Sequence, residues 1–593
     1  MKRIPIFYMV LFFTVVIVSQ LTAQETFPIL LQVNDATTGT VKGSVSNGYL
    51  MVDALEAMPL CGAEVHLCTE GFAIRSQYGR NFSALLVNRE KAIVKCQPQT
   101  VARKAWRTPD SFMVPYDFLA MCLDGMASYN ESENVLTVTC PPVQVIGSTI
   151  PLASEISTRL ASKGCQVQQG AIYHSSAVKI FSAGYTPDCN GNNANFPYLI
   201  MTTPVYPGAG LNAYDFPWIY RIEPTEAIVM IGNTPPECIY FSYRSYLINR
   251  YYDDGETPER KKLFASLGNT INHTVLNGSP EPSMIFNHPI MVISTACQNT
   301  ADLVKQAAMV AGFSENDIYL DVVPSCILNM GFNENADTLS ILHRVSLIKD
   351  ENEKETYLGS PPLEILRITP GPSSEFSPLP LVSLIERTTG VTEFELTHEM
   401  NELRTAIIDR YTSYGTPMVF PTHDWFPEGL SAIQSRLNVL GEVHDTLYLA
   451  TDDFRFMKND LVVVFGVNHT KTGKAVYANV SCYGAEYSNG IGGVTNEMYE
   501  RTASDYIPGH ENSDKFYVWK FARFQFDEQT FVVPPNTNMD FTGIDYGDKT
   551  FVAFRAYIDN ATGVGPASWE TIHDEVIVFR PRKTSEGNSW STR

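Results

Sequence analysis

The chain has 593 residues, of which 44% are hydrophobic and 18% charged, a composition that is ordinary for globular domains and excludes a disordered chain. At roughly 100–200 residues per domain, this length indicates about three to four domains. The formal net charge of −21 argues against a nucleic-acid partner, because affinity for phosphate chains depends on Lys and Arg. No P-loop, GxGxxG, HExxH or GxSxG motif is present, so a nucleotide enzyme or a standard serine hydrolase is not supported.

The N-terminus has the plan of a secretory signal peptide. Lys2 and Arg3 precede an almost entirely apolar run over residues 4–18, and Leu21-Thr22-Ala23 is a small-residue cleavage motif. We therefore expect residues 1–23 to be a signal peptide, and the protein to be secreted, extracellular or associated with the cell envelope. The apolar run is shorter than the about 20 residues that span a bilayer. We expect no integral membrane span after cleavage, with an uncleaved anchor as the alternative.

Residues 27–142 contain a weak internal duplication. The layout around Val52 and Gly62 returns around Val114 and Gly125. Each copy is typical of a short strand, a short helix that is ended by the Gly, and another strand. In the second copy a polar turn is followed by alternating β-branched residues over 135–138, which favours a hairpin strand.

The second copy, SFMVPYDFLAMCLDGMASYNESENVLTVTC, resembles the stalk or copper-amine-oxidase-like N-terminal domain family. Val114-Pro115, Phe118-Leu119-Ala120, Gly125 and residues 135–138 match the family's repeated scaffold, whereas Tyr116-Asp117 stand where the family usually has Leu-Arg. The resemblance implies that residues 24–142 form a small α+β module of a secreted or wall-associated protein. It also implies that this module is non-catalytic and carries no copper or quinone chemistry.

The middle of the chain, residues 143–369, is expected to form a mixed α/β domain. Residues 150–165 favour an amphipathic helix, and residues 239–248 alternate aromatic and polar side chains like a half-exposed strand. An apolar run over 289–294, a helical pattern over 299–311 ended by Gly312, and a strand pattern over 318–323 predict a βαβ unit. Further strands are predicted at 178–181, 198–201 and 227–232.

A Pro-rich connector over 369–380 marks the next boundary, and residues 370–593 are expected to form a helical segment followed by a β-rich domain. Helices are predicted at 398–414 and 429–440, and residues 467–474 are predicted to be a polar hairpin loop. Strands are predicted at 447–450, 461–467, 474–483, 515–524 and 550–557. The fold class expected from the sequence is thus α+β and multi-domain: a small stalk-like module, a mixed α/β domain and a β-rich C-terminal domain.

Polar residues that could carry chemistry gather in the last third of the chain. The weak candidates for a catalytic site are His423, Asp424, Asp453, His469 and His510, because a His beside a carboxylate can act as a general base. Four of them, His423, Asp424, His469 and His510, are also weak candidates for metal ligands. No cofactor is predicted, and a divalent metal stays open. Solvent-exposed or loop-capping roles for these side chains are the alternative, since convergence in space cannot be read from sequence.

Three functional hypotheses follow. The first is a secreted or cell-surface protein in which a non-catalytic stalk-like module attaches or spaces a large C-terminal binding region, whose partner is a cell-envelope component, a glycan or a protein. The second is a secreted hydrolase, metal-assisted or not, with its site in the C-terminal third. The third is a small-molecule or redox-binding protein that uses the α/β region. A deep apolar pocket at the carboxyl ends of the strands within residues 290–323 would favour the third hypothesis.

Overall fold

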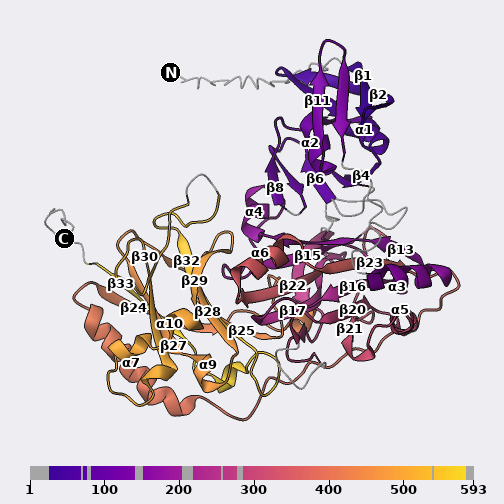
Figure 1. The fold of residues 1–593 in the computed structure, drawn as a ribbon. Coiled ribbons are helices and arrows are strands. Elements are labelled where there is room, and N and C mark those ends of the chain that lie inside the picture. The colour runs from indigo at the N-terminus through magenta and orange to yellow at the C-terminus, as the bar shows by residue number, and fades with distance from the viewer. Residues whose placement is uncertain are drawn as a thin grey trace, which may run out of the picture.

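The computed structural model describes residues 26–68, 71–76, 82–95, 97–140, 151–203, 218–255, 258–276, 285–536 and 540–581. The fold is β-rich, with several sheets and fewer helices. In Figure 1 the N-terminal module stands above a two-part body, with the middle of the chain on one side and the C-terminal part on the other. The predicted signal peptide, residues 1–23, lies outside the described residues. None of the helices in the described ranges is both long and apolar enough to cross a bilayer.

The N-terminal module is built on a seven-stranded sheet in the order β11-β12-β1-β2-β3-β10-β9, in which β1 pairs with β12 in parallel. Both copies of the duplication contain the predicted strand, helix and strand, β3-α1-β4 and β10-α2-β11, and the two helices pack on one core with the sheet. The elements are β1 (Phe27–Val33), β2 (Ala36–Ser46), β3 (Tyr49–Asp53), α1 (Ala54–Leu60), β9 (Trp106–Thr108), β10 (Ser111–Pro115), α2 (Tyr116–Cys122), β11 (Met126–Asn130) and β12 (Val135–Thr139).

The two helices end in different ways. Gly62 follows α1 with a left-handed φ of 78°, the conformation that favours glycine after a helix. After α2 the left-handed residue is Asp124, with φ 53°. Gly125 is instead required by a close approach, since a Cβ there would lie 2.2 Å from the carbonyl oxygen of Thr139. Asp53 joins the two copies, because its Oδ1 accepts hydrogen bonds from the backbone N–H groups of Leu55 and Phe112.

Between the two copies lie four strands that the sequence did not predict, and together with β4 of the first copy they form a five-stranded antiparallel meander. It contains β4 (Ala63–Cys68), β5 (Gly71–Ser76), β6 (Phe82–Leu86), β7 (Lys91–Val94) and β8 (Gln97–Thr100). Ala84, Leu86 and Ile93 of this meander pack against Ile180 and Tyr185 of the middle part. The Tyr185 hydroxyl lies 3.0 Å from the carbonyl oxygens of both Ala84 and Lys91. The meander therefore fixes the N-terminal module to the body.

The middle part contains two packed sheets and a layer of helices. One sheet has the order β13-β23-β16-β20-β21 and the other β14-β15-β22-β17-β18, with β19 added to β17. Residues from the facing sides of both sheets form one core, and α3 and α5 cover the outer face of the first sheet. The elements are α3 (Pro151–Ser162), β13 (Gln166–Gln169), β14 (Ala171–Ser175), α4 (Ala177–Ser182), β15 (Tyr198–Thr202), β16 (Ala227–Asn233), β17 (Cys238–Tyr252), β18 (Glu259–Ser266), β19 (Ile271–Asn272), β20 (Pro289–Thr295), α5 (Gln298–Val310), β21 (Ile318–Val322), β22 (Thr338–Ile348), α6 (Glu351–Gly359) and β23 (Leu363–Thr369).

The predicted βαβ unit is confirmed, because β20 and β21 pair in parallel on either side of α5. Two other predictions were wrong. The expected strand at 178–181 is the short helix α4, whose first turn is capped by Ser176, the Oγ of which accepts from the Lys179 N–H. The expected half-exposed strand at 239–248 is buried from residue 240 to residue 248. Its apolar face meets the other sheet, and Tyr240 packs against Tyr477 and Tyr557 of the C-terminal part.

The C-terminal part is a strongly curved sheet in the order β29-β28-β32-β25-β24-β33-β27-β30-β31, with β26 paired to β32. One core lies between its two halves, and α7 packs on the outside of the β33-β27-β30 half. The elements are α7 (Thr397–Tyr411), β24 (Thr416–Asp424), α8 (Gly429–Ser435), β25 (Thr446–Thr451), β26 (Phe454–Arg455), β27 (Leu461–Val467), α9 (His469–Thr472), β28 (Tyr477–Gly484), β29 (Asn489–Thr495), α10 (Asn496–Tyr499), β30 (Phe516–Ala522), β31 (Thr530–Val532), β32 (Lys549–Tyr557) and β33 (Glu575–Arg580).

The predicted hairpin loop at 467–474 was wrong. This stretch contains the helix α9, and the strands that flank it, β27 and β28, do not pair with each other but lie in different halves of the sheet. The helix predicted at 429–440 is also shorter than expected: α8 ends at Ser435, and Arg436 adopts a left-handed φ of 55°.

The middle and C-terminal parts share a buried aromatic interface. Phe196 and Tyr240 of the middle part pack with Tyr477 and Tyr557 of the C-terminal sheet. The Tyr240 hydroxyl also donates to a carboxylate oxygen of Asp445, over 2.9 Å. Because this interface is buried and hydrogen-bonded, the middle and C-terminal parts form one continuous body.

Candidate functional site

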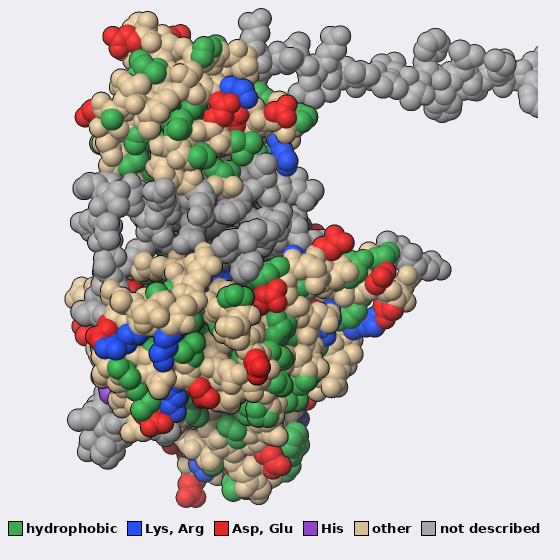
Figure 2. All heavy atoms as spheres, turned by 90° about the vertical axis from the view of Figure 1, so that its right-hand side faces the viewer, with side chains coloured by type: hydrophobic (Ala, Val, Ile, Leu, Met, Phe, Trp, Pro, Cys, Tyr) green, Lys and Arg blue, Asp and Glu red, His purple; other side chains and the backbone are tan. Residues whose placement is uncertain are grey.

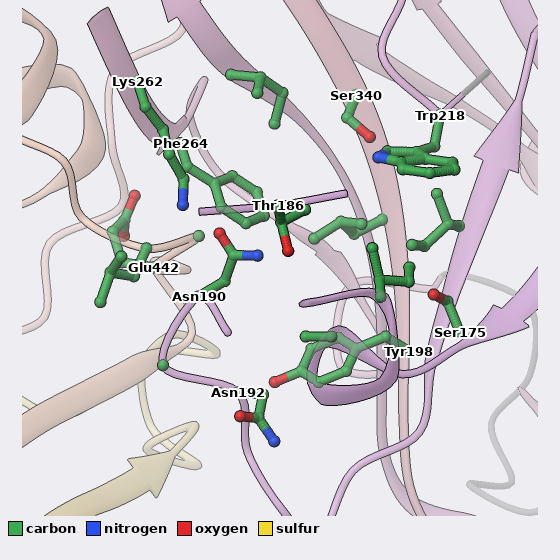
Figure 3. A pocket seen from close by; sticks show the side chains of 18 of the residues that line it. Ser175, Thr186, Asn190, Asn192, Tyr198, Trp218, Lys262, Phe264, Ser340 and Glu442 are labelled. Carbon is green, nitrogen blue, oxygen red and sulfur yellow. The ribbon is translucent and has the colours of Figure 1, made fainter. Parts of the chain in front are cut away.

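A cavity of about 420 Å³ lies between the second sheet of the middle part and the C-terminal part. This volume falls in the range of about 300–1,000 Å³ that is usual for small-molecule sites. Figure 3 shows Lys262 and Glu442 on one side of the cavity and Trp218 and Ser175 on the other. The cavity does not lie at the carboxyl ends of β20 and β21, so the βαβ unit supports the neighbouring sheet rather than the site itself.

The floor of the cavity follows from the alternation of side chains along the strands. On β15 and β22, Tyr198 pairs with Arg344 and Ile200 with Leu342, and these residues all line the cavity. Leu199, which lies between Tyr198 and Ile200 on β15, points to the opposite face and belongs to the core between the two sheets. One face of the sheet thus builds the core and the other builds the site.

The other walls come from segments that are far apart in the sequence. The chain between α4 and β15 contributes residues 185–187 and 190–192, and the C-terminal part contributes residues 440–442 and three aromatic side chains, Phe426, Tyr448 and Tyr557. Together with Tyr185, Tyr198, Trp218 and Phe264, seven aromatic side chains line the space. Such a wall suits an apolar or ring-shaped molecule.

Arg344 of β22 is one of two buried arginines at the cavity, with a relative exposure of 3%. Its guanidinium donates to the Tyr246 hydroxyl and to the carbonyl oxygen of Gly441. It also lies over two aromatic rings, with Cζ 5.1 Å from the ring centre of Tyr246 and 5.9 Å from that of Tyr198. Contacts of this kind attract a cation to the ring faces and hold the guanidinium in place.

Arg555 of β32 is the second, with a relative exposure of 4%. Its guanidinium donates to the Tyr483 hydroxyl and to the carbonyl oxygen of Gly191. Cζ lies 5.5 Å from the ring centre of Trp425 and 5.6 Å from that of Tyr448. Arg344 and Arg555 therefore face the same space from the middle part and from the C-terminal part.

Two further charged groups on the cavity wall already have protein partners. Lys262 Nζ lies 2.8 Å from Asp188 Oδ1, and burial lowers the pKa of Lys262 although Asp188 opposes the shift. Glu442 Oε1 accepts from the N–H and hydroxyl of Ser266 at 3.0 and 2.6 Å. Burial, followed by the nearby Glu428 carboxylate, raises the pKa of Glu442.

The five candidate residues of the sequence analysis are not joined to one another. Among the described residues, no hydrogen bond or ion pair connects any two of them. His423 is exposed on β24, Asp453 Oδ2 lies 3.5 Å from Lys549 Nζ, and His510 Nε2 lies 2.7 Å from Glu402 Oε2. Within the described ranges, no three His, Cys, Asp or Glu side chains gather in a way that could hold a metal ion.

His469 is the one candidate that is deeply buried, and it does not cap a loop as the alternative interpretation had it. Its Nδ1 lies 2.9 Å from Glu393 Oε1, and its Nε2 lies 3.8 Å from Asp574 Oδ2, which is too long for a hydrogen bond. Burial alone would lower the pKa of His469, but the Glu393 and Asp574 carboxylates outweigh burial and raise the pKa to about 10. A His that is protonated at neutral pH in this way stabilises the fold and does not act there as a general base.

Asp424 belongs to a separate surface cluster. The Ser568 hydroxyl donates to Asp424 Oδ1 over 2.6 Å, and Ser568 Oγ lies 2.9 Å from His573 Nε2. In a catalytic triad the carboxylate orients the His, and the Ser hydroxyl donates to that His. Here the carboxylate takes the hydrogen bond of the Ser instead, so the arrangement does not activate Ser568 as a nucleophile.

The two cavity arginines were missed by the sequence analysis. Arg344 is the one Lys, Arg, Asp or Glu of the largely buried strand TLSILHRVSLI, and Arg555 lies in the buried run FVAFRAY of β32, after Lys549 at the start of that strand. A charged side chain within a buried strand needs a partner or a function. That local signal could have singled out both residues, although not their proximity.

Comparisons with known proteins leave the function open. No protein-family model matches the chain, and no curated protein matches it either. A solved structure of an uncharacterised protein from Burkholderia cenocepacia is similar at 11% identity and a TM-score of 0.31, covering 72% of this chain and 86% of that one. A structure from Vibrio parahaemolyticus is similar at 12% identity and a TM-score of 0.29, covering 67% and 94%. At such low scores, neither likeness informs the fold or the function of this chain.

Proposed function

We propose that this chain is an exported binding protein that holds a small organic molecule in the cavity between its middle and C-terminal parts. The N-terminal module, in this proposal, is the stalk-like spacer that its sequence resembles and takes no part in any chemistry. Export is supported by the signal-peptide plan of residues 1–23. The hydrolase alternative is not favoured, because its candidate residues lie in separate contacts.

The cavity itself carries the proposal. It combines about 420 Å³ of space with aromatic walls and a few buried polar groups, which is the usual composition of a small-molecule site. Its walls are held by independent interactions: the meander anchors Tyr185, and the aromatic interface anchors Tyr557. A preformed site binds without a large ordering cost.

The experiment is fluorescence titration with the neutral probe N-phenyl-1-naphthylamine, which becomes bright in apolar sites. We expect saturable binding to the full mature chain. Leu342→Trp should abolish it, because Leu342 lies on the cavity floor and is 7% exposed. Leu437→Trp is the matched control, since Leu437 is 48% exposed and does not line the cavity. Equal binding by both variants, or none by the unaltered chain, would contradict the proposal.

A further inference from the structure

The charge of the cavity is opposite to that of the chain as a whole. The chain has a formal net charge of −21, and Figure 2 shows acidic and basic side chains interspersed over the face that it presents. The cavity lining, by contrast, contains four basic side chains, of Arg260, Lys262, Arg344 and Arg555, and one acidic side chain, of Glu442. A positive lining in an acidic protein indicates selection by charge.

Arg344 and Arg555 differ from two other buried arginines, Arg244 and Arg367, which are paired with carboxylates. Arg244 lies 2.5 Å from Asp321, and Arg367 lies 2.6 Å from Glu226. Within the part of the chain that the structure describes, no carboxylate lies within 4.0 Å of the guanidinium of Arg344 or Arg555. Because a buried charge is costly unless it is paired, these two cations call for a partner that the protein does not supply.

Both guanidinium groups retain donors for such a partner. Each uses two of its N–H groups in hydrogen bonds to a Tyr hydroxyl and a backbone carbonyl. An arginine has five N–H donors in a planar fork that matches a carboxylate. The remaining donors of Arg344 and Arg555 have no acceptor among the described residues.

The two arginines lie at the same end of the cavity. Arg344 stacks on Tyr198, and Arg555 stacks on Tyr448. Arg344 donates to the carbonyl oxygen of Gly441 and Arg555 to that of Gly191. These two backbone segments are adjacent, because a Cβ at Gly191 would lie 3.2 Å from the side chain of Leu440, the residue before Gly441. Trp218 and Phe264 line the same cavity, and their rings offer an apolar surface to the rest of a ligand.

We propose that the cavity binds an aromatic carboxylate, with the carboxylate group held between Arg344 and Arg555 and the ring packed against the aromatic walls. This inference rests on the proposed binding function and adds the chemical class of the ligand. In this proposal the ligand carboxylate accepts hydrogen bonds from the remaining N–H groups of the two guanidinium groups, and the ligand ring displaces water from the apolar wall. Both features distinguish the site from a pocket for neutral apolar molecules.

The experiment compares 2-naphthoate with 2-naphthamide, which have the same ring and differ in charge, by isothermal titration calorimetry on the full mature chain. We expect 2-naphthoate to bind at least tenfold more tightly. Arg344→Gln and Arg555→Gln should each weaken 2-naphthoate at least tenfold and change 2-naphthamide by less than threefold. Arg501→Gln is the charge control, because the side chain of Arg501 is 77% exposed and lies outside the cavity.

The outcomes separate the ligand class from the binding function. Equal affinity for the acid and the amide, or no effect of either Arg→Gln change, overturns the inference. The proposed binding function still holds in that case if N-phenyl-1-naphthylamine binds. Binding of the neutral fluorescent probe without any binding of 2-naphthoate also overturns it. Arg344→Lys and Arg555→Lys serve if the Gln variants do not fold. These Lys variants keep the positive charge but lack the planar set of N–H donors of arginine. A partial loss of 2-naphthoate affinity in them supports the inference.

Discussion

Protonated His469 should make the stability of the protein fall as the pH rises above neutrality. An unfolded His has a pKa of about 6.5, whereas the Glu393 and Asp574 carboxylates overcome burial and raise the folded pKa of His469 to about 10. The folded state therefore holds one more proton than the unfolded state between these values. The stabilisation is complete below about pH 6.5 and is lost as the pH rises through about 10.

The size of the effect follows from the same two pKa values. Each pH unit in this window removes about 1.4 kcal/mol from the free energy of unfolding, and the whole window is worth roughly 5 kcal/mol. Between pH 7 and pH 8.5 the protein should lose about 2 kcal/mol through His469 alone. The His469→Gln variant cannot bind this proton. Between pH 7 and pH 8.5 its free energy of unfolding should therefore fall by about 2 kcal/mol less than that of the unaltered chain.

The assay combines urea unfolding at several pH values with hydrogen–deuterium exchange at the imidazole Cε1 position, which reports the pKa of single histidines by mass spectrometry. His398 is the internal control, because its side chain is 79% exposed and its exchange reports an imidazole open to solvent. A measured pKa of His469 below 7 would refute the reasoning. So would equal pH slopes for the unaltered chain and for His469→Gln.

Two other changes test the interactions that shape the body. Asp321→Ala should destabilise the middle part by about 3–5 kcal/mol, because it leaves the buried Arg244 without its partner; urea unfolding measures this, and a loss below 1 kcal/mol would contradict it. Tyr185→Phe removes the hydroxyl that bonds the carbonyls of Ala84 and Lys91 at a cost of about 1–3 kcal/mol. Limited proteolysis should then cleave the meander faster, and an unchanged rate would argue against the anchor.

Local patterns predicted local structure well. The βαβ unit was visible because an apolar strand, a helix ended by Gly312 and a second strand follow one another within about 35 residues, and the parallel pairing of β20 with β21 confirmed it. The strand–helix–strand order in the N-terminal module was visible for the same reason. The length of α4, six residues, was too short for its periodicity to distinguish a helix from a strand.

What the sequence could not predict depends on distant partners. Arg244 lies in a strand that was predicted to be half-exposed, yet it is buried and its partner Asp321 lies on the other sheet of the middle part. His469 was placed in a hairpin because its polar neighbours resemble a turn, but β27 and β28 lie in different halves of the sheet. The cavity was out of reach for the same reason, since its walls come from strands that pair only after the chain has folded.

The walls of the cavity span the chain from Ser175 to Tyr557, and this span has a consequence for biogenesis. During synthesis the middle part can form its two sheets, but the site stays open on one side until β32 (Lys549–Tyr557) has been made and paired. Contacts of such high sequence separation form slowly. A chain truncated at the Pro-rich connector would present the floor residues to solvent, so under the proposed function a ligand can bind only after the C-terminal part has folded onto the middle part.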